Sequence, residues 1–259
     1  MYFCALKMKK STHICILLTL LLCSSAIVAQ STTNQVDSKG RKQGLWRKNF
    51  ENGKPRYEGS FKDDQPEGVF RYYVDSGELK MVSFFSNKGL RSYTKGLDNK
   101  GNIISEGVFV DQKKDSVWTY YNEEHIPVSR ETYTLGKRIG SWYVYYTHGQ
   151  VSEEMNYAND ERHGPWIQYY EDGVKRLTAN YKDGMLHGKI AYNWANGKPE
   201  LMGNYVDDLR QGTWYHFEEN GNIKETEVFK DGVSDKLNIQ KFEKLDVDEQ
   251  KLLNTPPGQ

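Results

Sequence analysis

Aromatic and glycine positions recur along this chain every 24 residues. The same register position holds Gly44, Gly68, Ser92, Ser116, Gly140, Gly164, Gly188 and Gly212. Two residues further on it holds Trp46, Phe70, Thr94, Trp118, Trp142, Trp166, Ile190 and Trp214. A period kept over eight units without insertion is typical of a repeat protein. We therefore number the positions of each unit from 1 to 24, beginning at this glycine or serine.

The pattern within a unit predicts a β-hairpin. A first strand rich in aromatic and β-prone residues ends at a turn with glycine at position 10, as in Asn196-Gly197, which suits a type I′ turn. The position-10 glycines are Gly53, Gly77, Gly101, Gly149, Gly173, Gly197 and Gly221. A second strand leads to position 18, which is aromatic in every unit: Phe61, Phe85, Phe109, Tyr133, Tyr157, Tyr181, Tyr205 and Phe229.

These signals predict an all-β protein, an elongated single-layer antiparallel meander of about eight hairpin repeats. About sixteen strands spaced by roughly 4.8 Å would extend about 75 Å. Neighbouring repeats would stabilise one another by placing Trp on Trp and Tyr on Tyr along the sheet. The predicted divisions are a signal peptide (1–29), a flexible segment (30–43), the repeats (44–235) and a C-terminal helical cap or tail (236–259).

Position 16 is often small, which leaves room for a neighbouring ring to lie across the strand backbone. It holds Gly59, Ser83, Gly107, Ala179 and Gly203 in five of the units. The unit that begins at Ser92 has Thr94 in place of a ring, but Gly101 and Phe109 keep its register. We interpret it as a degenerate repeat rather than a linker.

The N-terminus predicts export. Basic residues at Lys7, Lys9 and Lys10 precede an apolar run, 14–23, that is too short to span a bilayer comfortably. Cleavage after Ala29 or Ala26 would leave 32 basic and 35 acidic residues, a net charge of −3. We expect a periplasmic, outer-membrane or cell-surface location, with membrane association possible but not favoured by this charge.

All three cysteines, Cys4, Cys15 and Cys23, lie within the predicted signal peptide. A mature chain without cysteine has no disulfide, thiolate metal site or cysteine nucleophile. Lipidation of Cys23 is disfavoured, because the bulky Leu22 precedes it where lipoprotein signals usually carry a small residue.

No catalytic motif, metal site or cofactor is expected. His163 and His187 are one period apart, about 9 to 10 Å, which is too far for both to bind one zinc ion. The pairs Asp63-Asp64 and Asp207-Asp208 recur at positions 20 and 21, so turn chemistry explains them. The run 98–102 lacks the glutamate of a calcium loop, and the balanced charge argues against nucleic-acid binding.

Aromatic residues at position 6 are the candidate binding residues. Because side chains alternate across a strand, position 6 lies on the face opposite to position 3. This set consists of Tyr73, Tyr121, Tyr145, Tyr169 and Phe217. Exposed aromatic residues often anchor protein partners; alternatively, these rings only cover one another along the sheet.

The run from Gly164 to Gly188, Gly-x-Trp-x-x-Tyr-Tyr-Glu-Asp-Gly followed by Tyr-Lys-Asp-Gly-Met-Leu-His-Gly, resembles the bacterial variant of the MORN repeat. The resemblance covers residues 44 to about 234. Exported proteins of this kind are grouped with the YwqK-like family, which is labelled as antitoxin. The resemblance implies a β-hairpin ribbon that serves as a scaffold or binding surface.

We therefore expect an exported, non-enzymatic scaffold for protein–protein interaction in the bacterial cell envelope. Two alternatives remain: an antitoxin- or immunity-like protein that neutralises one partner, and a peripheral lipid-binding protein. The sequence leaves the partner and the oligomeric state open.

Overall fold

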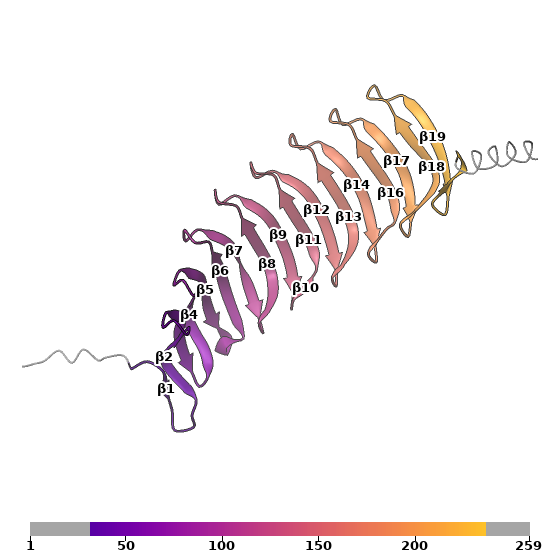
Figure 1. The fold of residues 1–259 in the computed structure, drawn as a ribbon. Coiled ribbons are helices and arrows are strands. Elements are labelled where there is room, and N and C mark those ends of the chain that lie inside the picture. Colours follow the sequence, from indigo (N-terminus) through magenta and orange to yellow (C-terminus); the bar gives the residue numbers. More distant parts are fainter. Residues whose placement is uncertain (1–31, 237–259) are drawn as a thin grey trace, which may run out of the picture.

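The computed structural model describes residues 32–236, which form one open antiparallel sheet in meander order (Figure 1). The predictions for the signal peptide, the cysteines and the C-terminal helix or tail lie outside the described residues. Within that range no helix is long and apolar enough to cross a membrane.

Twenty strands make up the sheet, and successive strands pair along the chain, so the hairpins follow one another from one end of the elongated molecule to the other. The elements are β1 (Gln35–Val36), β2 (Lys42–Asn49), β3 (Pro55–Lys62), β4 (Gln65–Tyr73), β5 (Leu79–Ser86), η1 (Asn87–Gly89), β6 (Arg91–Leu97), β7 (Ile103–Val110), β8 (Lys113–Tyr121), β9 (Pro127–Thr134), β10 (Lys137–Arg138), β11 (Gly140–Tyr145), β12 (Val151–Ala158), β13 (Glu161–Tyr169), β14 (Lys175–Lys182), β15 (Met185–Leu186), β16 (Gly188–Asn193), β17 (Pro199–Val206), β18 (Leu209–Phe217), β19 (Ile223–Lys230) and β20 (Val233–Ser234). Four of them, β1, β10, β15 and β20, have only two residues. The other sixteen are the strands that the period predicts.

The position-10 glycines are left-handed, with φ from 80° to 101°. The turn type predicted there is wrong, however. Residues 51 and 52 do not have positive φ, and the Gly53 N–H donates to the Phe50 carbonyl. This is a type I turn followed by a left-handed glycine, the usual three-residue hairpin loop. Two consecutive positive φ values occur instead at positions 20 and 21, as at Asp63 and Asp64, so the type I′ turns join one repeat to the next.

Position 1 favours glycine because the strand bulges there. The ladder passes from the pair Glu58 and Arg71 to the pair Ser60 and Glu67, which leaves two extra residues on β4. Gly68, inside this bulge, has a φ of 69°. A left-handed residue at a bulge bends the strand and favours glycine.

The repeat that begins at Ser92 lacks this bulge. Strands β5 and β6 pair without interruption from Met81 opposite Gly96 to Ser86 opposite Arg91. The two extra residues lie instead in a four-residue loop, 87–90, that contains η1. The 24-residue period is thus preserved by different local geometry, which confirms a degenerate repeat.

Aromatic rings at positions 3 and 18 alternate along one face, which we call the ring face (positions 3, 14, 16 and 18). The Phe70 ring lies between Phe61 and Phe85, with centroid distances of 5.2 and 4.9 Å. The Trp142 ring lies 5.3 Å from Tyr133 and 4.8 Å from Tyr157. The expectation of Trp stacked on Trp is wrong, because successive position-3 residues are two strands apart and a position-18 ring fills the space between them.

A basic side chain covers many of these rings from position 23 of the preceding repeat. The Arg210 guanidinium lies 4.3 Å from the Trp214 centroid and 5.1 Å from that of Phe229. Equivalent contacts come from Lys42, Lys114, Arg138 and Arg162. Cations over ring faces are attracted to them while shielding the rings from water.

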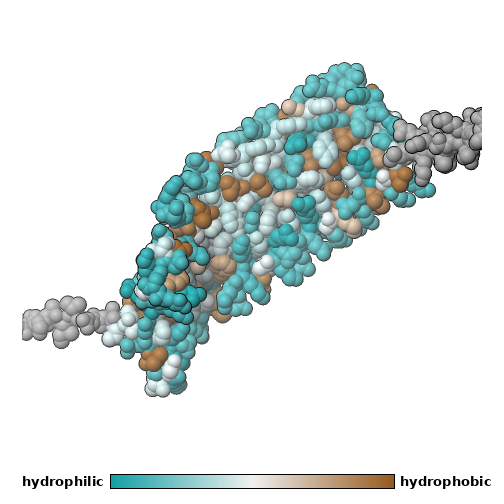
Figure 2. Space-filling model, in the orientation of Figure 1, coloured by the Kyte–Doolittle hydropathy of each residue, from teal (hydrophilic) through white to brown (hydrophobic). Residues whose placement is uncertain are grey.

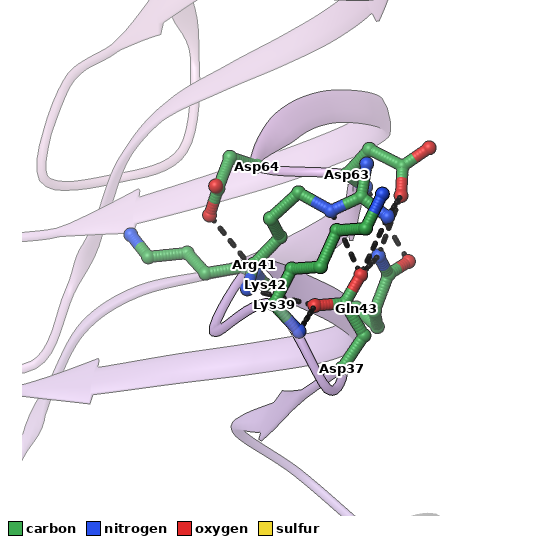
Figure 3. A network of polar contacts seen from close by, with 7 residues as sticks. All are labelled: Asp37, Lys39, Arg41, Lys42, Gln43, Asp63 and Asp64. Atoms are coloured by element: carbon green, nitrogen blue, oxygen red, sulfur yellow. Dashed lines mark hydrogen bonds and ion pairs between the residues drawn. The ribbon is translucent and has the colours of Figure 1, made fainter.

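The segment predicted to be flexible, 30–43, contributes β1, which pairs with β2. Arg41 bridges the Asp37 carboxylate at 2.6 Å and the Asp63 carboxylate at 2.9 Å (Figure 3). The backbone N–H and guanidinium of Arg41 hold the pKa of Asp37 near 2. This network ties the first strand to the turn of the first repeat.

Candidate binding site

The face opposite the ring face carries the predicted binding residues. We call it the tyrosine face, and it consists of positions 2, 4, 6, 15 and 17. Strand alternation puts these positions on one side, and hydrogen bonds between positions 6 and 15 of adjacent repeats confirm it for three pairs. All five predicted residues, Tyr73, Tyr121, Tyr145, Tyr169 and Phe217, are half-buried there.

Three of the four phenols in this set donate to glutamates of the preceding repeat. Tyr121 donates to Glu106 at 2.6 Å and Tyr169 donates to Glu154 at 2.9 Å. Tyr73 donates to Glu58 at 3.3 Å. These bonds fix the rings and couple adjacent hairpins. The sequence signal for them is a glutamate fifteen residues before each tyrosine, which our sequence analysis missed.

Tyr145 and Phe217 are placed differently, because position 15 of the preceding repeat holds Arg130 and Met202. Their ring neighbours are on their own strands: Tyr143 lies 6.5 Å from Tyr145, and Tyr215 lies 6.4 Å from Phe217. The five residues therefore do not form one uniform binding row.

The tyrosine–glutamate pairs also shift pKa values. Burial and the bond to Glu154 raise the pKa of Tyr169 to about 12, and the same two causes act on Tyr93 beside Glu106 with the same result. The hydrogen bonds from Tyr121 and Tyr93 hold the pKa of Glu106 below its ordinary value. At neutral pH these groups are thus a charged acceptor and neutral donors, which strengthens the bonds.

Exposed apolar side chains gather on the tyrosine face where β4, β5 and β6 pair. Val69 lies opposite Phe84, and Phe84 lies opposite Tyr93. Their exposed fractions are 43%, 54% and 43%. We call these three residues the Phe84 patch. The sequence signal was an apolar residue at position 17, where three later repeats have Asn156, Asn180 and Asn204.

A smaller exposed apolar pair lies nearer the C-terminal end, where Met202 faces Tyr215 across β17 and β18. Between it and the Phe84 patch, the row of positions 2 and 17 first contains Val108, Val117, which is 41% exposed, and Thr132, and then Ser141, Asn156, Pro165, Asn180, Lys189 and Asn204. In the view of Figure 2, hydrophobic residues likewise form separate groups among hydrophilic and intermediate ones. The exposed apolar residues of this row are thus interrupted by the stretch from Ser141 to Asn204.

The histidines and paired acids serve the turns. His187 Nδ1 lies 3.1 Å from the Asp207 carboxylate, and Gln211 at the equivalent position donates to Asp231 at 2.7 Å. His163 contacts Asp183 in the same way, at 3.4 Å. The second aspartate, Asp208, accepts from the backbone N–H of Leu186. Because glutamine replaces histidine in this role, turn-to-turn bonding accounts for these residues.

Comparison with known proteins supports the repeat class. A family model described as MORN repeat variant matches residues 42–63, 138–159, 162–183 and 210–231. The first residues of these segments differ by whole multiples of 24. Comparison with curated proteins gives no match.

Solved structures show only distant likeness. A mutant of S. aureus TarM in complex with fondaparinux, α-GlcNAc-glycerol and UDP is 12% identical over 46% of this chain and 19% of its own, with a TM-score of 0.23. A second structure of TarM is 13% identical over 46% and 20%, at 0.22. A porin-like protein from Bacteroides uniformis is 10% identical over 73% and 91%, at 0.19.

Scores this low establish neither a shared fold nor a shared function, and the chain matches only about a fifth of the length of the TarM proteins. The period, the hairpin register and the four matched segments carry the assignment. Four segments of the chain match the MORN repeat variant, and they lie within a run of eight hairpins that share one 24-residue period.

Proposed function

We propose that this protein is an exported, non-enzymatic repeat scaffold that binds a protein partner in the bacterial cell envelope through its tyrosine face. The Phe84 patch is the observation that carries the proposal. Phe84 is more than half exposed in the body of a paired strand, between two exposed apolar neighbours, so much of its ring is left in contact with solvent. Such a patch is typical of a surface that a partner covers.

The surroundings of the patch suit a protein partner. Glu106 accepts from Tyr93 and lies 3.9 Å from the Lys95 ammonium, so polar groups border the apolar centre. An apolar centre with a polar rim is the usual composition of a protein interface. The fixed tyrosine–glutamate pairs keep this face ordered before binding, which lowers the entropy lost on association.

Two other roles fit the same repeat class. An antitoxin- or immunity-like protein, as the YwqK-like label suggests, would bind one partner tightly and stoichiometrically. A peripheral lipid-binding protein would need attraction to anionic lipid, which a mature net charge of −3 does not provide.

Cross-linked affinity purification of the mature protein from the envelope fraction, followed by mass spectrometry, separates these roles. If the protein is a scaffold, the purification recovers several envelope proteins. If it is immunity-like, the purification recovers a single partner in stoichiometric amount. A parallel flotation assay with vesicles of anionic phospholipid tests the third role. Flotation that weakens with added salt, together with no protein recovered, would overturn the proposal.

A further inference from the structure

The repeat that begins at Ser92 leaves a gap in the ring face. In the preceding repeat the Phe70 ring fills the space between Phe61 and Phe85, and in the repeat from Gly140 the Trp142 ring fills the space between Tyr133 and Tyr157. The corresponding space between Phe85 and Phe109 has no ring, because position 3 there is Thr94.

A pocket of about 180 Å³ occupies this place. Its apolar lining includes Tyr72, Met81, Phe85, Leu90 and Phe109. An engineered apolar cavity of roughly 150 Å³ is large enough to bind benzene. The pocket is therefore large enough for one aromatic ring.

Three buried hydroxyl groups give the pocket a polar floor. Ser83, Ser92 and Thr94 also line it, and each is at most 5% exposed. The Ser83 and Thr94 hydroxyls are 2.8 Å apart and share one hydrogen bond, in which either oxygen can be the donor. Because a hydroxyl oxygen has two lone pairs, this group can accept a further hydrogen bond from a ligand.

The rim of the pocket also differs from the repeats in which a basic side chain covers the rings. Position 23, which carries a cation over the rings in five places, is Leu90 here, and its side chain is 53% exposed. The pocket thus lacks the basic cover seen at Trp118 or Trp214. An apolar rim favours an uncharged ligand.

We infer that this pocket binds a single uncharged aromatic ring bearing one N–H or O–H group, the chemistry of an indole or a phenol. Two other repeats provide the model, because the indoles of Trp118 and Trp142 at position 3 pack against position-18 rings and donate their N–H groups to protein oxygens. Trp118 Nε1 donates to the Val108 carbonyl at 2.9 Å, and Trp142 Nε1 donates to the Thr132 carbonyl at 3.1 Å. The pocket lies on the ring face, so this inference is independent of the proposed function of the tyrosine face.

The test is a titration of the mature protein with indole, followed by NMR of the Met81 and Leu90 methyl groups. We expect saturable shifts with a dissociation constant on the order of 1 mM. Indene, which has the same shape but no N–H group, should bind several-fold more weakly. N-acetyl-tryptophanamide, which carries the ring on a backbone fragment, shows whether the ring can come from a peptide chain or only as a free small molecule.

Thr94→Trp places the missing ring in the pocket and should weaken indole binding at least tenfold. If this variant does not fold, Ser83→Gly combined with Thr94→Trp recreates the glycine-under-ring pair of the other repeats. Leu135→Ala, at an exposed turn residue that does not line the pocket, is the control and should bind indole as the unmodified protein does. No saturable shift at about 10 mM indole, ten times the expected constant, or equal binding by the ring-filled variant, would overturn the inference.

Discussion

The indole ring of Trp214 lies so close over the backbone of Gly203 that a methyl group on this glycine would overlap with the ring atoms. Phe70 covers Gly59 and Trp118 covers Gly107 in the same way. Glycine normally weakens a strand because it loses much backbone entropy and offers no side chain to pack. Here the ring of the next repeat supplies the missing packing, so each such pair joins two hairpins.

Gly203→Ala should therefore lower the free energy of unfolding by about 3 kcal/mol, because the added methyl group displaces the Trp214 ring from a packed site. Urea unfolding followed by circular dichroism measures the change. Ala179→Gly is the control at the same register position, where Ile190 replaces the ring, and should cost only about 1 kcal/mol. Equal losses in the two variants would show that the ring does not depend on glycine.

Arg210→Met should lower the free energy of unfolding by about 1 kcal/mol, because it keeps a long apolar side chain but removes the charge over Trp214 and Phe229. Leu186 occupies the equivalent position one repeat earlier, so an uncharged residue is sterically acceptable there. Lys182→Met, which removes a positive charge outside the cation–ring contacts found in residues 32–236, is the control. If both substitutions had the same small effect, the cation–ring contact would contribute nothing to the free energy of unfolding.

The raised tyrosine pKa values predict a loss of stability in alkali. Tyr93 and Tyr169 have pKa values near 12 in the folded protein, against 10.0 for an unperturbed tyrosine. Between these values the unfolded chain binds fewer protons than the folded one, so the free energy of unfolding falls as pH rises. Below pH 10 this contribution is fully present.

Urea unfolding midpoints measured between pH 9 and 12, at intervals of about one pH unit, test this dependence. Tyr169→Phe removes one of the ionising groups, so its midpoint should decline less steeply than that of the unmodified protein. Tyr143→Phe, at a neighbouring tyrosine on the same face, is the matched comparison. If Tyr169→Phe left the decline of the urea midpoint with pH unchanged, the loss of stability in alkali could not be assigned to this residue.

The fold could be predicted because the same pattern of aromatic and glycine positions recurs in eight units. The period fixed the strand number, and the small residues at position 16 indicated where rings would cross the backbone. The turns could be misassigned, because Asn-Gly pairs suit both a type I′ turn and the end of a three-residue loop. Which geometry forms depends on the φ of the residues before the glycine and on the strand register.

The binding surface was harder to predict, because strand alternation gives the face of a residue but not its exposure. Tyr121 and Tyr169 looked free in the sequence, yet glutamates of the preceding repeat hold their phenols. Phe84 was not predicted as a binding residue, because the sequence does not show that its ring stays exposed between its cross-strand neighbours, Val69 and Tyr93. The sequence shows that Thr94 replaces a ring, but it does not show that the surrounding side chains leave a pocket there.

The affinity of the captured partner for Phe84→Ala tests the central claim most directly, compared with the unmodified protein and with Leu135→Ala. Leu135 is exposed to a similar degree, 51%, but lies in a turn outside the Phe84 patch. We expect Phe84→Ala to weaken binding at least tenfold, as removal of a central aromatic anchor commonly does, while Leu135→Ala has no effect and both variants keep the stability of the parent. Undiminished binding by a folded Phe84→Ala variant would contradict the claim that the tyrosine face binds the partner.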